Sequence, residues 1–209
     1  MNRILNEKGG TVLAFGAHPD DIEIGAGGLL ARLSAEGADV TMAVVSIPNQ
    51  MDIRRREAKG GADAIDADLM VLFDDKPLRV EDVPMHEIVR RMDQLIGDLH
   101  PDLVVTHSAN DLHWDHGLVH RATISALRRT PCDLLAYLSS PEMNAHARHV
   151  GECFADITKS IDAKLAAINC HSSQLTKLDV ESSRDLARAM GRISGYEYAE
   201  AYQVLRMRV

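Results

Sequence analysis

The chain has 209 residues, 45% of them hydrophobic and 26% charged, and it carries a net charge of -8 at pH 7. This length and composition suit one domain with a full hydrophobic core, and they exclude disordered, collagen-like and disulfide-rich proteins. The negative charge and the aromatic content of 4% argue against nucleic-acid binding. The sequence shows neither an apolar run of the roughly 18 residues that a membrane span needs nor a signal peptide. We therefore expect one cytoplasmic domain over residues 1–209.

Strand-like and helix-like patterns alternate along the chain. The strand-like stretches are short apolar runs at Thr11–Gly16, Asp39–Ser46, Asp68–Phe73, Asp102–Thr106, Asp133–Leu138 and Ala201–Met207. The helix-like stretches are Gly27–Glu36, Arg54–Ile65, Val83–Leu99, His116–Leu127, Thr158–Cys170 and Glu181–Met190. This alternation predicts a Rossmann-like, doubly wound α/β fold, with a mostly parallel sheet and helices on both faces. With the strand order 3-2-1-4-5, the loops after the first and fourth strands are neighbours.

The three cysteines, Cys132, Cys153 and Cys170, have no CxxC spacing and are odd in number. This pattern argues against a disulfide framework and against a cysteine zinc site, and it favours reduced thiols in the cytoplasm. The glycines at 25–28 do not have the spacing of a dinucleotide-binding loop. We expect them to allow close packing of a helix against a strand.

Histidine and aspartate gather in the two loops that the fold places at the ligand-binding edge. The first loop reads H-P-D-D-I-E at 18–23, and the second reads D-L-H-W-D-H at 111–116. His18 and Asp21, completed by His116, form a three-ligand set with one open position, which is typical of catalytic zinc; Fe²⁺ and Co²⁺ also suit these donors. Read alone, the first loop equally fits a strand-end turn. His116 and His120, four residues apart, form a rival ligand pair.

Three further residues of these loops have side chains suited to metal-assisted hydrolysis. Asp20 adjoins the predicted ligands and fits a general base, while His113 fits a proton donor that stabilises an oxyanion. Asp115 is suited to orienting a histidine. We expect His107 to be a loop or pocket histidine and not a ligand.

The two motifs together resemble the LmbE-like, or PIG-L, family of zinc-dependent de-N-acetylases. Supporting resemblances are an R-x-x-E helix start, a K-x-x-A segment followed by H-x-S-Q, and a Y-A-E-A-Y ending, at Arg54–Glu57, Lys164–Ala167, His171–Gln174 and Tyr198–Tyr202. The resemblance implies that His18, Asp21 and His116 bind zinc. It also implies that Asp20 is the base and that His113 stabilises the oxyanion or protonates the amine.

Arg54 and His171 are the predicted substrate-binding residues. The three arginines at 54–56 stand at the start of a predicted helix, where the dipole disfavours cations, so an anionic or hydroxylated substrate would offset them. The alternative is a solvated face screened by Asp52 and Glu57. His171 is either a pocket residue or a cation at a helix C-terminus.

The sequence thus predicts a zinc-dependent hydrolase that removes an N-acetyl or N-acyl group from an N-acetylglucosamine-type amino sugar or glycoconjugate. One alternative is an amidase of a thiol-sugar conjugate. Another is a non-catalytic Rossmann-like module that binds a sugar or a metal. The sequence identifies neither the aglycone of the substrate nor the oligomeric state. It is compatible with a homo-oligomer.

Overall fold

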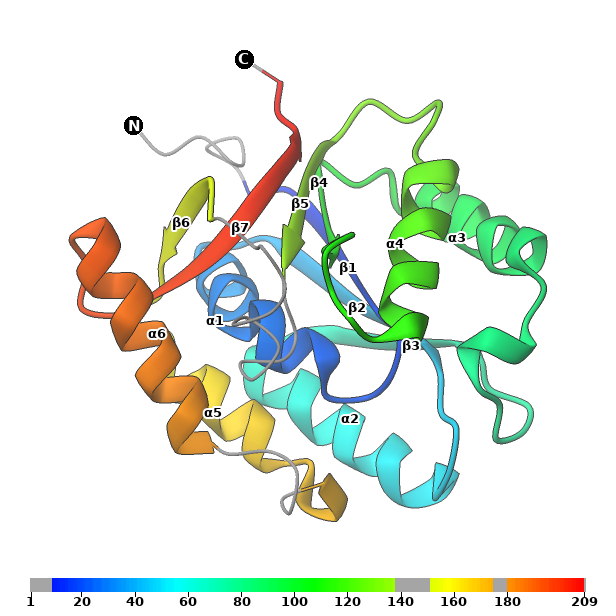
Figure 1. Cartoon of the computed structure of the whole chain (residues 1–209), viewed down its shortest axis with the longest axis horizontal. Coiled ribbons are helices and arrows are strands. Elements are labelled where there is room, and N and C mark those ends of the chain that lie inside the picture. Colours follow the sequence, from blue (N-terminus) through cyan, green and yellow to red (C-terminus); the bar gives the residue numbers. More distant parts are fainter. Residues whose placement is uncertain (1–8, 138–150, 175–179, 209) are drawn as a thin grey trace.

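The computed structural model describes residues 9–137, 151–174 and 180–208, which build one sheet with helices on both faces (Figure 1). The strands run in the order β3-β2-β1-β4-β5-β7-β6. Their bounds are β1 Thr11–Gly16, β2 Asp39–Ser46, β3 Asp68–Phe73, β4 Leu103–His107, β5 Asp133–Tyr137, β6 Cys153–Asp156 and β7 Ala199–Arg206. The first five strands are parallel, and β7 and β6 extend the sheet in antiparallel pairing. The predicted fold class and the predicted order of the first five strands are therefore confirmed.

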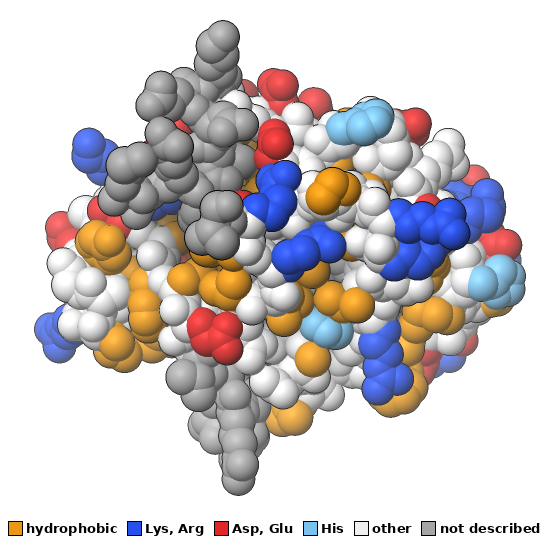
Figure 2. Space-filling model, turned by 90° about the horizontal axis from the view of Figure 1, so that it is seen from above, with side chains coloured by type: hydrophobic (Ala, Val, Ile, Leu, Met, Phe, Trp, Pro, Cys, Tyr) orange, Lys and Arg blue, Asp and Glu red, His pale blue; other side chains and the backbone are white. Residues whose placement is uncertain are grey.

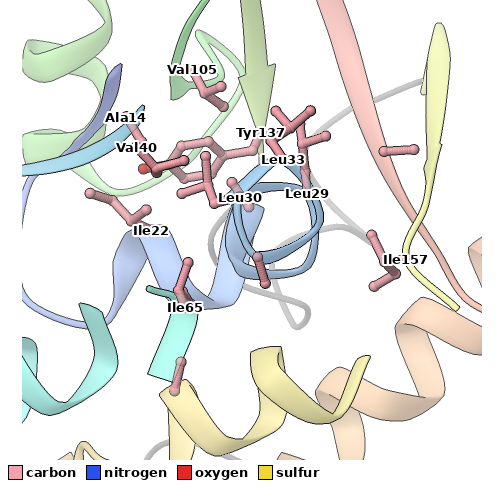
Figure 3. Close-up of a cluster of buried hydrophobic side chains, with 14 of the residues drawn as sticks. Ala14, Ile22, Leu29, Leu30, Leu33, Val40, Ile65, Val105, Tyr137 and Ile157 are labelled. Atoms are coloured by element: carbon pink, nitrogen blue, oxygen red, sulfur yellow. The ribbon is translucent and has the colours of Figure 1, made fainter. Parts of the chain in front are cut away.

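The helices are α1 Asp21–Ala35, α2 Met51–Ile65, α3 Met85–Leu99, α4 Trp114–Ala126, α5 Ile161–Asn169 and α6 Val180–Ser194, with 3-10 turns η1 Val80–Asp82 and η3 Ser172–Gln174. One core lies between the sheet and α1, α2 and α5, and it contains Leu29, Ile65 and Tyr137 (Figure 3). A second core lies between the sheet and α3 and α4. Each parallel strand is therefore covered by apolar side chains on both faces.

Three helices begin at least two residues earlier than the sequence predicts. α1 begins at Asp21 instead of Gly27, α2 at Met51 instead of Arg54, and α4 at Trp114 instead of His116. Each of these helices has an acidic residue in its first turn, where the helix dipole stabilises a negative charge. Two of these acidic residues, Asp21 and Asp115, are predicted site residues, and they therefore lie in helices and not in loops. The short strand β6 was not predicted. Leu138, the expected end of the fifth strand, lies outside the described residues.

The glycines of α1 let the helix lie close to its neighbours. A Cβ atom on Gly28 would stand 2.7 Å from Ile157, and one on Gly25 would clash with the ring of Tyr137. Tyr137 in turn donates a hydrogen bond to the Phe15 carbonyl at the end of β1, at 2.7 Å. Close packing therefore explains these glycines, as the sequence predicted.

A buried ion pair between α5 and the last strand bonds the backbone of α1. Glu200 accepts hydrogen bonds from the N–H groups of Gly28 and Leu29 at 2.9 and 2.8 Å, and it pairs with Lys164. Lys164 Nζ also donates to the carbonyl of Ile24, the acceptor that the Gly28 N–H would use in a regular helix. Helix α1 thus depends on side chains from α5 and β7 in its interior.

Replacing Lys164 with Met should lower the free energy of unfolding by about 3–5 kcal/mol, because the Glu200 carboxylate would stay buried without its partner. Urea denaturation measures this value. The exposed Lys159, replaced in the same way, is the control. Adding Glu200→Gln to the Lys164→Met variant should recover part of the loss, since no buried charge then remains unpaired. Equal free energies of unfolding for Lys164→Met and Lys159→Met would show that the ion pair of Lys164 and Glu200 does not stabilise the helix.

The described ends of the chain lie at the top of Figure 1, at the edge of the sheet where the parallel strands begin. Viewed from that end, basic, acidic and hydrophobic side chains stand next to one another (Figure 2). In the part of the chain that the structure describes, no helix has the length and apolar character to cross a membrane. All three cysteines are unpaired.

Candidate active site

The first and second loops meet at the carboxyl ends of β1 and β4, which are neighbours in the sheet. Asp21, the first residue of α1, lies between the other two predicted ligands. Its Oδ1 atom is 3.2 Å from Nε2 of His116, and its Oδ2 atom is 3.7 Å from Nδ1 of His18. The fold therefore brings together the three residues that the sequence predicts as ligands.

Among the residues that the structure describes, two groups of three side chains have donor atoms close enough to share a metal ion, and His116 belongs to both. The first group is His18, His113 and His116; the second is Asp21, His107 and His116. The predicted set draws members from each. Neutral imidazole nitrogens and one carboxylate suit zinc, and also iron or cobalt, so the donor chemistry fits the expected ion.

Two other histidines use their nitrogens in bonds to the backbone. His107 Nε2 accepts a hydrogen bond from the N–H of Ala17 at 3.0 Å. Burial, together with the charge of His116, lowers the pKa of His107 to about 4, which keeps this ring neutral. His120 Nδ1 lies 2.8 Å from the His107 carbonyl, and His120 belongs to neither group. The structure therefore gives no support to the rival His116–His120 pair.

Carboxylates orient the two central histidines. Asp111 Oδ2 lies 2.9 Å from His116 Nδ1, and Asp115 Oδ2 lies 3.0 Å from His18 Nε2. Carboxylate partners of this kind fix the ring and the tautomer of a ligating histidine. The expected orienting residue, Asp115, thus has His18 as its partner. Asp111 was given no role from the sequence, although it opens the second motif.

His116 holds positive charge between two acids. Burial opposes the charged form, but the charge of Asp21 and the hydrogen bonds to Asp111 and Asp21 raise the pKa of His116 to about 10. The two carboxylates therefore favour positive charge beside them, which a divalent cation at this place would also supply. This electrostatic environment also fits a metal ion.

Asp20 lies beside the ligand groups in an unusual backbone conformation, with φ at 98°. Burial, reinforced by the charge of Asp21, raises the pKa of the Asp20 carboxyl to about 7, although Arg54 opposes the shift. A carboxyl with a pKa near neutrality is suited to exchanging protons with a substrate or water.

Arg54 is buried and contacts the first loop. Its Nη2 atom donates to the Pro19 carbonyl at 3.0 Å and to Asp20 Oδ2 at 3.3 Å. Because α2 begins at Met51, Arg54 stands a full turn inside the helix, and the argument from an unfavourable helix start does not apply to it. Arg55 pairs with Asp74, and Arg56 is exposed. The substrate contact predicted for Arg54 stays a prediction.

His171 has no exposed surface, and its Nε2 atom lies 2.8 Å from Glu23 Oε1. Burial opposes the charged ring, but the hydrogen bond to Glu23 raises the pKa of His171. The predicted direct contact with substrate is therefore not supported, since the ring is enclosed by the protein. The sequence could not indicate this, because Glu23 is 148 residues away.

His113 stands at the exposed mouth of the site. Asp111 Oδ1 accepts from its N–H at 3.0 Å, and its own Nδ1 accepts from the N–H of Asp115 at 3.2 Å. Burial and the charge of His116 lower the pKa of His113. Its neighbours Leu112 and Trp114 are 59% and 64% exposed. The hydrogen-bonded loop thus presents one imidazole and two apolar side chains to solvent.

Comparisons with known proteins identify the relatives of this chain. Residues 13–127 match the PIG-L family, described as GlcNAc-PI de-N-acetylase. The chain is 29% identical over 185 residues to a probable N-acetyl-alpha-D-glucosaminyl L-malate deacetylase 2 of Bacillus cereus, covering 78% of this chain and 83% of that protein.

Solved structures share the fold at lower sequence identity. The N,N'-diacetylchitobiose deacetylase of Pyrococcus horikoshii is similar with a TM-score of 0.74 and 20% identity, over 93% of this chain and 83% of that one. The 4-carboxy-2-hydroxymuconate hydratase GalB of Pseudomonas putida is similar with a TM-score of 0.77 and 22% identity, over 96% and 98% of the two chains. Because the family match spans more than half of the sequence and includes both motif loops, the chain belongs to the PIG-L family of de-N-acetylases, which are hydrolases.

Proposed function

We propose that this protein is a metal-dependent de-N-acetylase of an N-acetylglucosamine-type amino sugar derivative, with zinc as the metal. The family match and the deacetylase relatives support the reaction type. The hydratase among the structural neighbours shows that this fold also carries other reactions, so the proposal must rest on the site and not on the fold.

One observation carries the proposal: a carboxylate base and an exposed imidazole lie on the same cluster as the ligand residues. Asp20 adjoins Asp21 in the chain, and the ring of His113 stacks on that of His116 with centroids 4.3 Å apart. Binding a metal or a sugar alone would need neither group. The arrangement therefore favours an enzyme over a non-catalytic module.

The proposed ligands of the metal are His18, Asp21 and His116. A bound zinc ion supplies a Lewis acid that polarises the amide carbonyl and acidifies water. Asp20 accepts the proton of the attacking water at its carboxylate. His113 donates a hydrogen bond to the oxyanion or a proton to the leaving amine. Asp115 and Asp111 keep the rings of His18 and His116 in orientation.

We also propose that Trp114 and Leu112 receive the sugar. Large exposed apolar side chains beside a catalytic histidine provide a flat surface for the C–H face of a pyranose ring. Arg54, next to Asp20, is the proposed partner of substrate hydroxyl groups. We propose a cytoplasmic location, which the three unpaired cysteines support.

A panel of N-acetylglucosamine derivatives, assayed for acetate and for new primary amine, tests the function. We expect release of both in equal amounts, loss of activity after chelation, and recovery with Zn²⁺, Fe²⁺ or Co²⁺. Release of a different acid with the amine would identify the amidase of a thiol-sugar conjugate. Sugar binding without any amine release would contradict the proposal and favour a binding module.

A further inference from the structure

The turn that follows α5 bonds two buried carboxylates of other helices. His171 Nε2 lies 2.8 Å from Glu23 Oε1 in α1. Ser173 donates to Glu57 in α2 from its N–H and its hydroxyl, each at 2.6 Å, and the Ser172 hydroxyl donates to Glu57 at 3.0 Å. A Cβ atom on Gly61 would stand 3.2 Å from His171 Nε2, so α2 also closes over this contact.

Both carboxylates lie one helical turn from the proposed base and its partner. Glu23 follows Asp20 by three residues at the start of α1, and Glu57 follows Arg54 by three residues in α2. Arg54 in turn bonds Pro19 and Asp20. The turn at 171–173 is therefore connected to the Asp20 segment twice, through the first turn of α1 and through the turn of α2 that carries Arg54.

Asp20 needs such support, because its backbone is strained. A φ of 98° is unfavourable for a residue with a side chain, and such conformations persist only where the surroundings hold them. No side chain caps the N-terminus of α1 at this residue. The contacts of Arg54 and Glu23 are among those that hold this segment in place.

The pair of His171 and Glu23 is not arranged for greatest stability. Within the described parts of the chain, His171 Nδ1 and Glu23 Oε2 are both buried and lack a hydrogen-bond partner. A buried ionic contact with unsatisfied atoms contributes little to stability, although it can specify one conformation over others. This favours a role in positioning.

We propose that His171, Ser172 and Ser173 form a clamp that positions Asp20, acting through Glu23 on one side and through Glu57 and Arg54 on the other. The proposal rests on the proposed function, in which Asp20 is the base. His171 is then a positioning residue and touches neither substrate nor metal.

His171→Ala should lower kcat by about 10- to 100-fold, because misplacing a catalytic group by about 1 Å has effects of this size. KM and metal content should stay near those of the wild type. Hydrogen exchange of the amides at 20–24, where the Ile24 N–H bonds the Asp20 carbonyl, should become faster. His171→Gln, whose amide nitrogen can replace Nε2, should restore most of kcat and of the amide protection. The double variant Ser172→Ala/Ser173→Ala, a milder change, should shift both readouts in the same direction.

Ser160→Ala is the matched control. The Ser160 hydroxyl is buried and also ties α5 to α1, by donating to the Gly28 carbonyl at 2.7 Å, but it does so far from Asp20. This variant should lower the melting temperature without changing kcat or the exchange at 20–24. Unchanged exchange at 20–24 in both the His171→Ala and the double variant would overturn the proposal. So would a loss of stability in His171→Ala, equal to that of Ser160→Ala, with kcat unchanged.

An Asp20→Asn variant, measured in parallel, separates this proposal from the proposed function. If Asp20→Asn keeps its kcat, the proposed function fails in its choice of base, and the clamp as the positioning device of a base fails with it. If Asp20→Asn loses kcat while His171→Ala keeps both kcat and amide protection at 20–24, only the clamp is refuted.

Discussion

Asp20→Asn should reduce kcat by about 10²- to 10⁴-fold, the usual contribution of a positioned general base. The amide keeps the size of the side chain and its place beside Arg54, but it cannot accept the proton. Metal content should remain that of the wild type, because Asp20 is not among the proposed ligands. The measurement is kcat and zinc content on the same preparation.

Asp21→Asn is the matched comparison for this experiment, since it makes the same chemical change one residue further along. Asp21 lies between His18 and His116, so its variant should lose metal affinity first and activity as a consequence. A zinc-replete Asp20→Asn enzyme with nearly normal kcat would remove Asp20 from the mechanism. His113 would then be the remaining candidate base.

His116→Ala should abolish stable metal binding and with it the activity. His116 belongs to both groups of side chains that can share an ion, so no complete group survives its removal. The loss of a residue that only orients a metal ligand costs about 10- to 100-fold in metal affinity. The loss of the ligand His116 should therefore cost at least about 100-fold. Metal analysis after dialysis measures the effect.

His120→Ala provides the control, because His120 lies on the same helix and bonds the His107 carbonyl. It should retain full metal content. If His120→Ala loses the metal while His116→Ala keeps it, the ligand assignment is wrong. The variants His18→Ala and His107→Ala then tell the two groups apart, since each removes a member of only one.

Much of the fold follows from local patterns. The apolar runs of β1 to β5 are short and bounded by polar residues, and α3 has a clear apolar face, so both periods are visible in the sequence. The start of α1 is not visible, because the three glycines among residues 25–28 have low helix propensity and hide a helix in which they serve packing. Strand β6 escapes because four residues carry too short a pattern.

The candidate site likewise has one part that the sequence predicts and another that depends on tertiary packing. The two motif loops were predictable because parallel strands end at one edge of the sheet, which brings His18, Asp21 and His116 together. The roles of Arg54 and His171 were not predictable from the sequence. Each depends on a carboxylate in a distant part of the chain, Asp20 for Arg54 and Glu23 for His171. The spacing of residues in the sequence indicates candidate site residues, whereas tertiary packing determines the hydrogen-bond partner of each one.

The bond between Glu200 and the interior of α1 also bears on how the molecule assembles. Residues 172 positions apart must meet before the N–H group of Gly28 reaches its acceptor on β7. Contacts of such separation form late, because closing a long loop costs entropy before any contact compensates for it. The units from β1 to β4 can form through shorter loops, while α1, whose first residue is Asp21, reaches its final geometry only when β7 joins the sheet. Folding of this chain therefore ends at the helix on which its proposed chemistry begins.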